Sequence, residues 1–191
     1  MLSSDNNSAH IDVRAEELIA QAVQMFGPIC PPWKFEGVIF ADGGPHLLYY
    51  PETGGIQIAL SLRAIDDDLQ RDFQLAHEVC HLLYPAVDFN DPVKPKTNVL
   101  NEGISTYFSI LIIASDYGEE AAISALKSLA EHSPKYFSAF RLVSALMQRD
   151  SNAITKIRKI QPLINKIRNA DLRAVAVGLT DEQIETLVGC F

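Results

Sequence analysis

The chain has 191 residues and a formal net charge of −8, with 48% hydrophobic and 21% charged residues. These proportions are typical of a folded globular protein and exclude a largely disordered chain. The acidic balance argues against a nucleic acid or an anionic membrane as the principal ligand.

The first part of the sequence predicts one helix and three short strands. Residues 11–26 place apolar side chains at helical spacing, and Gly27 and Pro28 end that pattern. Short apolar runs separated by turn sequences then predict strands at residues 35–41, 46–50 and 56–62. The third run alternates apolar and polar residues, which indicates a half-exposed strand. We expect a small antiparallel or mixed sheet.

The rest of the sequence predicts helices. Residues 66–83 begin with three aspartates, which the positive end of a helix dipole favours. After a loop at 88–98, either Asn98 or Asn101 is expected to cap a second helix that ends near Ser115. Further helices are predicted at residues 118–132, 134–149, 152–168 and 180–189.

No clear domain boundary interrupts the sequence, so we expect one α+β domain over residues 1–191, with a core at 8–115 and a helical C-terminal part at 116–191. Charge is uneven along the chain: residues 1–126 carry 6 Lys or Arg against 18 Asp or Glu, whereas residues 127–191 carry 10 against 6. The two parts could attract one another, the basic part could dock an acidic protein partner, or the charges could only solvate helix surfaces.

The cysteines and the first residues indicate a reducing compartment. Cys30, Cys80 and Cys190 form neither a disulfide framework nor a CxxC pair. The opening MLSSDNNSAH lacks the basic and apolar regions of a secretion signal, and the most apolar run, residues 104–115, is too short and too polar to cross a bilayer. We therefore expect a cytoplasmic protein that has no membrane partner.

The strongest chemical signal is QLAHEVCHLLYP at residues 74–85. Side chains four residues apart lie on one face of a helix, so His77 and His81 can present two imidazoles to one ion. Glu78 points to the flank of that face, where it can reach a metal-activated water without being a ligand. This HExxH pattern predicts a zinc site.

A third ligand is expected, because catalytic zinc usually takes three protein ligands and a water molecule. Glu102 lies in VLNEGISTYF, near the start of the next predicted helix. An antiparallel return of that helix could bring Glu102 to the two histidines. We predict that zinc is bound by His77, His81 and Glu102; without the third ligand, the histidines would as readily be structural.

Together, QLAHEVCHLLYP and VLNEGISTYF resemble the gluzincin clan of zinc metallopeptidases, which combine HExxH with a glutamate on the following helix. The chain is too short for the large aminopeptidases of that clan, so the resemblance implies a minimal zincin-like core with a small sheet before the active-site helix. It also implies that His77, His81 and Glu102 bind zinc and that Glu78 is the general base of peptide hydrolysis. Many clan members have an aspartate where this chain has Thr106.

Further residues are candidates for supporting roles. Thr106 or a nearby polar group could accept an imidazole N–H and so orient a ligand. An exposed edge of the strand at 55–62 could pair with an extended substrate backbone. The oxyanion formed in peptide hydrolysis needs a hydrogen-bond donor. Candidates are Tyr84, Tyr107, Tyr117, Tyr136 and His132, and we favour the last two because they come from a later helix that could close over a cleft.

We therefore expect a zinc-dependent peptidase that acts on a peptide or protein substrate. Two other functions stay open. The first is a zincin-fold binding or regulatory module with little turnover, which the intact Glu78 disfavours. The second is a zinc hydrolase of a non-peptide bond.

Overall fold

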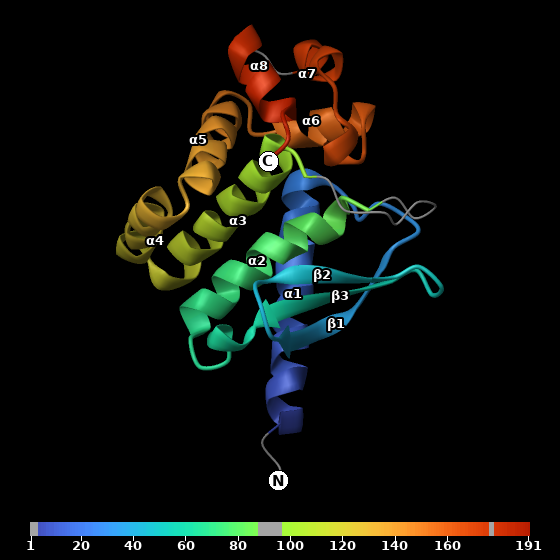
Figure 1. Cartoon of the computed structure of the whole chain (residues 1–191), viewed down its shortest axis with the longest axis vertical. Helices are drawn as coiled ribbons and strands as arrows, with labels where there is room; N and C mark the ends of the chain where they lie inside the picture. The colour runs from blue at the N-terminus through green and yellow to red at the C-terminus, as the bar shows by residue number, and fades with distance from the viewer. Residues whose placement is uncertain (1–3, 88–96, 176–177) are drawn as a thin grey trace.

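The computed structural model describes residues 4–87, 97–175 and 178–191 (Figure 1). Within these residues, eight α-helices and one three-stranded mixed sheet form an α+β fold, which confirms the predicted class. The strands are β1 (Lys34–Ala41), β2 (His46–Tyr50) and β3 (Gly55–Ser61). The helices are α1 (Ser4–Phe26), α2 (Asp68–Leu83), α3 (Val99–Tyr117), α4 (Glu119–His132), α5 (Pro134–Arg149), α6 (Ala153–Ile160), α7 (Asn169–Val175) and α8 (Asp181–Val188).

The sheet has the strand order β1-β3-β2, with β1 parallel and β2 antiparallel to the central strand β3. The prediction that the third strand is half-exposed and offers a free edge is therefore wrong. Both of its edges are paired, and Ile58, Ala59 and Leu60 are all fully buried. Alternation along a strand indicates which residues share a face, but it does not indicate which strand is central. Within the described residues, β2 lies at one edge of the sheet.

The helix α2 lies between the sheet and α3, and α1 runs behind both the sheet and α2 (Figure 1). An apolar stripe on α1 packs into the main core through Ala15, Leu18, Ala22 and Phe26, which are all fully buried. The helices α4 and α5 cover the other side of α3, and α6, α7 and α8 gather at the far end of the molecule. This packing fixes α2 and α3 against each other in the middle of the fold.

Several predicted boundaries shift in the structure. The first helix begins at Ser4, whereas the predicted helix covers residues 11–26. Asp67 caps α2 by accepting a hydrogen bond from the backbone N–H of Gln70, so of the three aspartates only Asp68 lies in the first turn. The predicted loop at 88–98 lies almost wholly outside the described residues.

The predicted helix at 152–168 is wrong in its second half. It ends at Ile160, a 3₁₀ turn follows at Ile164–Lys166, and α7 was not expected. Pro162 accounts for the break, because proline has no backbone N–H and its ring clashes with the preceding helical turn. In the described part of the chain, no helix is long and apolar enough to cross a membrane.

One arginine of the basic C-terminal part is buried. Arg158 is 7% exposed and donates hydrogen bonds to the backbone carbonyls of Phe26 and Gly27 at 2.8 Å and of Leu83 at 3.0 Å. Phe26 and Leu83 are the last residues of α1 and α2, whose final carbonyls have no partner inside their own helices. Its guanidinium also lies 5.2 Å from the centre of the Tyr84 ring. Arg158 thus joins the C-terminal ends of the two helices.

We expect Arg158→Met to lower the free energy of unfolding by about 3–5 kcal/mol, because it leaves several buried carbonyls without a donor. Urea unfolding followed by circular dichroism measures this change. The matched control is Arg173→Met, which removes an ion pair with Asp181 between side chains that are 50% and 78% exposed. That change should cost less than about 1 kcal/mol. Equal effects of the two substitutions would show that the hydrogen bonds of Arg158 add nothing to the free energy of unfolding.

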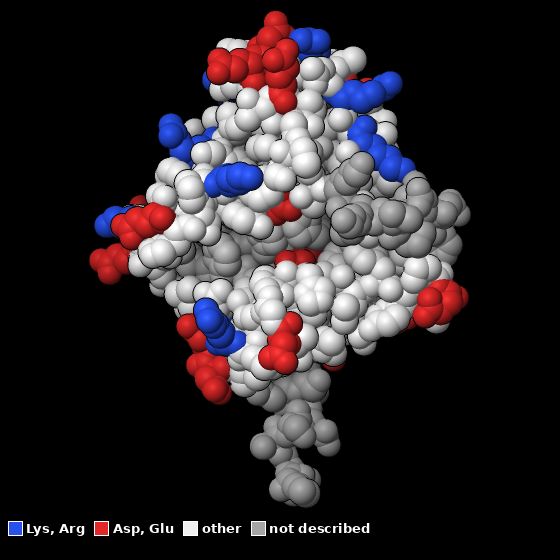
Figure 2. All heavy atoms as spheres, viewed as in Figure 1, with Lys and Arg blue, Asp and Glu red and all other residues white. Residues whose placement is uncertain are grey.

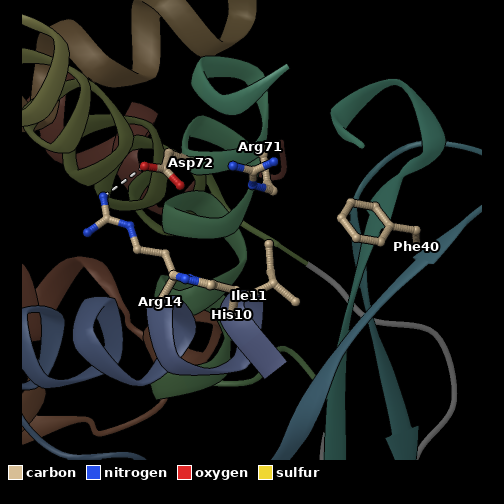
Figure 3. A pocket seen from close by; sticks show the side chains of 6 residues that line it. All are labelled: His10, Ile11, Arg14, Phe40, Arg71 and Asp72. Carbon is tan, nitrogen blue, oxygen red and sulfur yellow. Dashed lines mark hydrogen bonds and ion pairs between the residues drawn. The ribbon is translucent and has the colours of Figure 1, made fainter. Parts of the chain in front are cut away.

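An ion-pair network joins α1, α2 and α3 beside a cavity of about 220 Å³ (Figure 3). Arg14 lies 2.8 Å from Asp72 and also contacts Asp116. Tyr117 donates a hydrogen bond to the same Asp72 carboxylate at 3.1 Å. The cavity lies between α1, α2 and β1, and its lining includes no histidine of the HExxH motif. The network therefore fixes the helices that carry the motif, and Tyr117 is engaged in it.

Candidate metal centre

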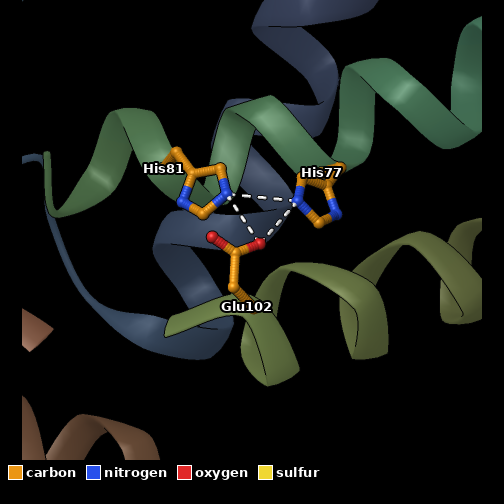
Figure 4. Close-up of side chains that lie close together, drawn as sticks. All are labelled: His77, His81 and Glu102. Carbon is orange, nitrogen blue, oxygen red and sulfur yellow. Dashed lines mark hydrogen bonds and ion pairs between the residues drawn. The ribbon is translucent and has the colours of Figure 1, made fainter. Parts of the chain in front are cut away.

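Two neighbouring helices bring three metal-binding side chains together (Figure 4). His77 and His81 stand one turn apart on α2, and Glu102 lies in the first turn of α3. The side chain of Asn98 accepts a hydrogen bond from the backbone N–H of Asn101 and so sets where α3 begins. This start places Glu102 opposite the two histidines, as the predicted return of the second helix requires.

The donor atoms of these side chains have the spacing of a metal-ligand set. The Nε2 atoms of His77 and His81 are 3.1 Å apart, and Glu102 Oε2 lies 3.2 Å from the first and 3.5 Å from the second. Two donors at about 2.0–2.1 Å from one tetrahedral ion are roughly 3.3 Å apart. The three distances bracket this value, so the group could bind a metal ion.

The site is buried and its charges are coupled. The side chains of His77 and Glu102 are 9% and 7% exposed. Burial alone would lower the pKa of His81, but the Glu102 carboxylate outweighs burial and raises that pKa to about 9. Burial alone would raise the pKa of Glu102, yet the two imidazoles hold it well below its usual range. At neutral pH the site therefore holds a proton that a metal ion would have to displace.

This proton predicts how metal affinity depends on pH. A histidine binds a metal only after it loses its proton, and the pKa of His81 is about 9. Below that pH, we expect the apparent metal affinity to fall about tenfold for each pH unit, provided that one proton leaves. Competition with a chelator of known pH dependence, at pH 7.0, 7.5, 8.0 and 8.5, measures the slope. An affinity that stays constant over this range would contradict the raised pKa.

A cleft of about 350 Å³ opens beside His77. Its lining combines the turn before β2, one face of α2 and residues of α3, α4 and α5; these residues include Pro45, Phe73, Gln74, His77, Glu78, Thr106, Leu129 and Tyr136. Figure 2 shows this face of the molecule hollowed between the sheet and the C-terminal helices, with acidic atoms on the floor of the hollow. The group of His77, His81 and Glu102 is thus buried among protein atoms, and His77 reaches the cleft.

Glu78 lines the same cleft as His77 and is only 4% exposed. Although it is nearly buried, no described residue forms a hydrogen bond or an ion pair with its carboxylate. A carboxylate beside a metal site that is not engaged by the protein can accept a proton from a bound molecule. Glu78 therefore shares a cleft with His77, and its role as general base stays a prediction.

The structure separates the candidates for an oxyanion donor. Tyr136 lines the cleft, and its ring centre lies 5.8 Å from that of His77. Burial and the charges of Glu102 and Glu78 raise the pKa of Tyr136 to about 12, so its hydroxyl keeps its proton and can donate it. The predicted alternative His132 is exposed and bonds through Nδ1 to the carbonyl of Ser128.

The other tyrosine candidates have different partners. The Tyr107 ring stacks on Phe140, and Tyr117 binds Asp72. Tyr84 is fully buried under Arg158. None of these three lines the cleft, so among the predicted tyrosine candidates only Tyr136 does.

The expected role of Thr106 is not seen. Its hydroxyl donates a hydrogen bond to the backbone carbonyl of Glu102 at 2.8 Å, and no hydrogen bond joins it to either described histidine. Helical threonines often bond in this way to the carbonyl four residues earlier. Asn101 was not named as a candidate from its sequence, but its amide is fully buried and contributes to the raised pKa of His81.

Asn101 is well placed to orient His81. The His81 ring directs Nε2 toward Glu102 and His77, which leaves Nδ1 for a second partner. Neither amide atom of Asn101 has a hydrogen-bond partner among the described residues. A buried amide is costly when unpaired, so a hydrogen bond from His81 Nδ1 to the Asn101 oxygen would satisfy both groups and fix the ring.

We expect Asn101→Leu to weaken zinc affinity about 10- to 100-fold, because a ligand without its outer partner is less well oriented and less basic. The matched control is Thr106→Val on the same helix, which should change the affinity by less than about threefold. Both are measured by chelator competition at pH 8. The reverse order of effects would return the orienting role to Thr106.

No protein-family model, curated protein or solved structure matches this chain.

Proposed function

We propose that this chain is a zinc-dependent hydrolase that cleaves peptide bonds, with a zincin-like core made of the sheet, α2 and α3. One observation supports the proposal above the others. Two imidazole nitrogens and one carboxylate oxygen lie 3.1–3.5 Å apart beside a cleft, next to a second carboxylate that no described residue engages. Two histidines and a glutamate form a known ligand set of catalytic zinc.

The roles of the residues follow from their positions. His77, His81 and Glu102 would hold the metal, which supplies an activated water and a Lewis acid when bound. Glu78 would accept the proton of the attacking water and pass it to the leaving amine. The Tyr136 hydroxyl would donate a hydrogen bond to the oxyanion that forms on the substrate carbonyl. A binding module would need neither of the last two groups in its cleft.

The shape of the cleft favours a peptide over a small non-peptide substrate. The 350 Å³ cleft continues into a groove of about 710 Å³ along the N-terminal half of α2. The two share four lining residues, namely Gly44, Pro45, Gln70 and Gln74. A continuous groove that passes a reactive centre suits an extended chain, and the edge strand β2 lies beside α2.

Cleavage of a mixed peptide library, read by mass spectrometry, tests the proposed reaction. Protein loaded with one equivalent of zinc should cleave a subset of the peptides, and protein treated with a chelator should cleave none. Cleavage that the chelator does not reduce would place the activity outside the metal site. A library left intact by the zinc-loaded protein would count against peptide hydrolysis.

A further inference from the structure

The ring of Tyr136 contacts two other rings. Its centre lies 5.8 Å from that of His77 and 4.7 Å from that of Phe191. The Phe191 and Tyr136 planes meet at 64°, which is the edge-to-face arrangement that aromatic pairs prefer. No described residue forms a hydrogen bond with the Tyr136 hydroxyl, so ring contacts rather than a polar partner set its orientation.

Phe191 is itself fixed by backbone hydrogen bonds. Its N–H donates to the carbonyl of Thr97 at 3.2 Å, and Val99 N–H donates to the carbonyl of Gly189 at 3.0 Å. Between these bonds, Cys190 pairs with Asn98 in an isolated β-bridge. The paired segment immediately precedes α3 and includes its cap, so the same stretch of backbone positions both Glu102 and Phe191.

Phe191 also lines a groove that is separate from the cleft. An apolar groove of about 360 Å³ lies between α5 and α8, and Phe191 is part of its wall together with Ala139, Leu142 and Cys190. Tyr136 lines the cleft but not this groove. Loss of the Phe191 ring would therefore give the Tyr136 side chain a second place to turn, away from His77.

We propose that Phe191 is a positioning residue, which keeps the Tyr136 hydroxyl in the cleft by packing its ring against the tyrosine. This inference rests on the proposed hydrolase function for its effect on rate, but the packing itself does not require activity. Phe191 lies 55 positions from Tyr136 in the sequence and carries no reactive group, so its part is to restrict one side chain rather than to touch a substrate.

Kinetics of the best-cleaved library peptide test the effect on rate. We expect Phe191→Ala to lower kcat roughly 3- to 10-fold with KM and zinc affinity unchanged, the size expected from one aromatic pair. Phe191→Tyr keeps the ring and should restore the rate. The control Leu142→Ala removes an apolar side chain from the same groove and should leave kcat within about twofold.

A double substitution separates positioning from general damage to the fold. Tyr136→Phe removes the hydroxyl and should lower kcat by about 10²–10³-fold. If Phe191 acts through that hydroxyl, adding Phe191→Ala to Tyr136→Phe should cause no further loss. A full additional 3- to 10-fold loss in the double variant would overturn the proposal.

A spectroscopic measurement tests whether Phe191 holds the Tyr136 ring in place, even if the protein cleaves no peptide. The chain is labelled with 3-fluorotyrosine, and the ¹⁹F signal that disappears in Tyr136→Phe identifies Tyr136. In zinc-loaded protein, Phe191→Ala should shift or broaden that signal, whereas Leu142→Ala should not. An unmoved Tyr136 signal would refute the positioning role, and a moved signal without hydrolysis would leave the packing established and the proposed reaction in error.

Discussion

Replacing Glu78 by glutamine should lower peptide hydrolysis by about 10²–10⁴-fold, the usual contribution of general acid–base catalysis. Glutamine keeps the size and shape of glutamate but does not take up a proton at neutral pH. Glu78 is nearly buried, lines the cleft and has no hydrogen-bond partner among the described residues, so the substitution breaks no contact that holds the fold. The metal should stay, because the three expected ligands are unchanged.

The measurement is kcat for one library peptide, with zinc content determined for each preparation. Glu131→Gln makes the same chemical change at an exposed position of α4 and serves as the matched control. We expect wild-type activity from the control and almost none from Glu78→Gln. If both variants cleave at the wild-type rate with equal zinc, Glu78 is not the base.

Removing a ligand should abolish the effect of the metal on stability. We expect Glu102→Ala to weaken zinc binding by more than about 100-fold, since loss of an outer partner alone commonly costs 10- to 100-fold. A metal that binds only the folded protein stabilises it by about 2.7 kcal/mol at a free concentration one hundred times its Kd. Zinc should therefore raise the melting temperature of the wild type and leave that of Glu102→Ala almost unchanged.

The metal-free proteins provide the comparison for this experiment. Glu102→Ala also removes the negative charge that faces His81, so the two proteins must be compared with and without zinc rather than only with it. Glu131→Ala controls for the loss of a glutamate and should keep the wild-type response to zinc. An equal rise in melting temperature for Glu102→Ala would remove Glu102 from the ligand set.

The parts of the fold that depend on local sequence were predictable. The strands β1 and β2 and the helices α2 and α3 lie close to their expected positions, because turn sequences, caps and apolar spacing act over a few residues. The central place of β3 was not predictable, since strand order is a long-range property. Pro162, by contrast, is a local signal that the helix prediction overlooked.

The same division applies to the site. The spacing of His77 and His81 follows from helix geometry alone, and a short return brings Glu102 to them. Asn101 and Phe191 carry no such signal: a buried amide and a distant phenylalanine gain their roles only from packing. The burial of Arg158 could not be predicted from the sequence either, because its neighbours form an ordinary amphipathic helix.

Crystals of the protein grown with one equivalent of zinc, measured on both sides of the zinc absorption edge, test the central claim most directly. The predicted result is one anomalous peak per chain, in contact with the Nε2 atoms of His77 and His81 and with the carboxylate of Glu102. A map without a peak among these three side chains, or with the zinc bound elsewhere on the chain, would contradict it.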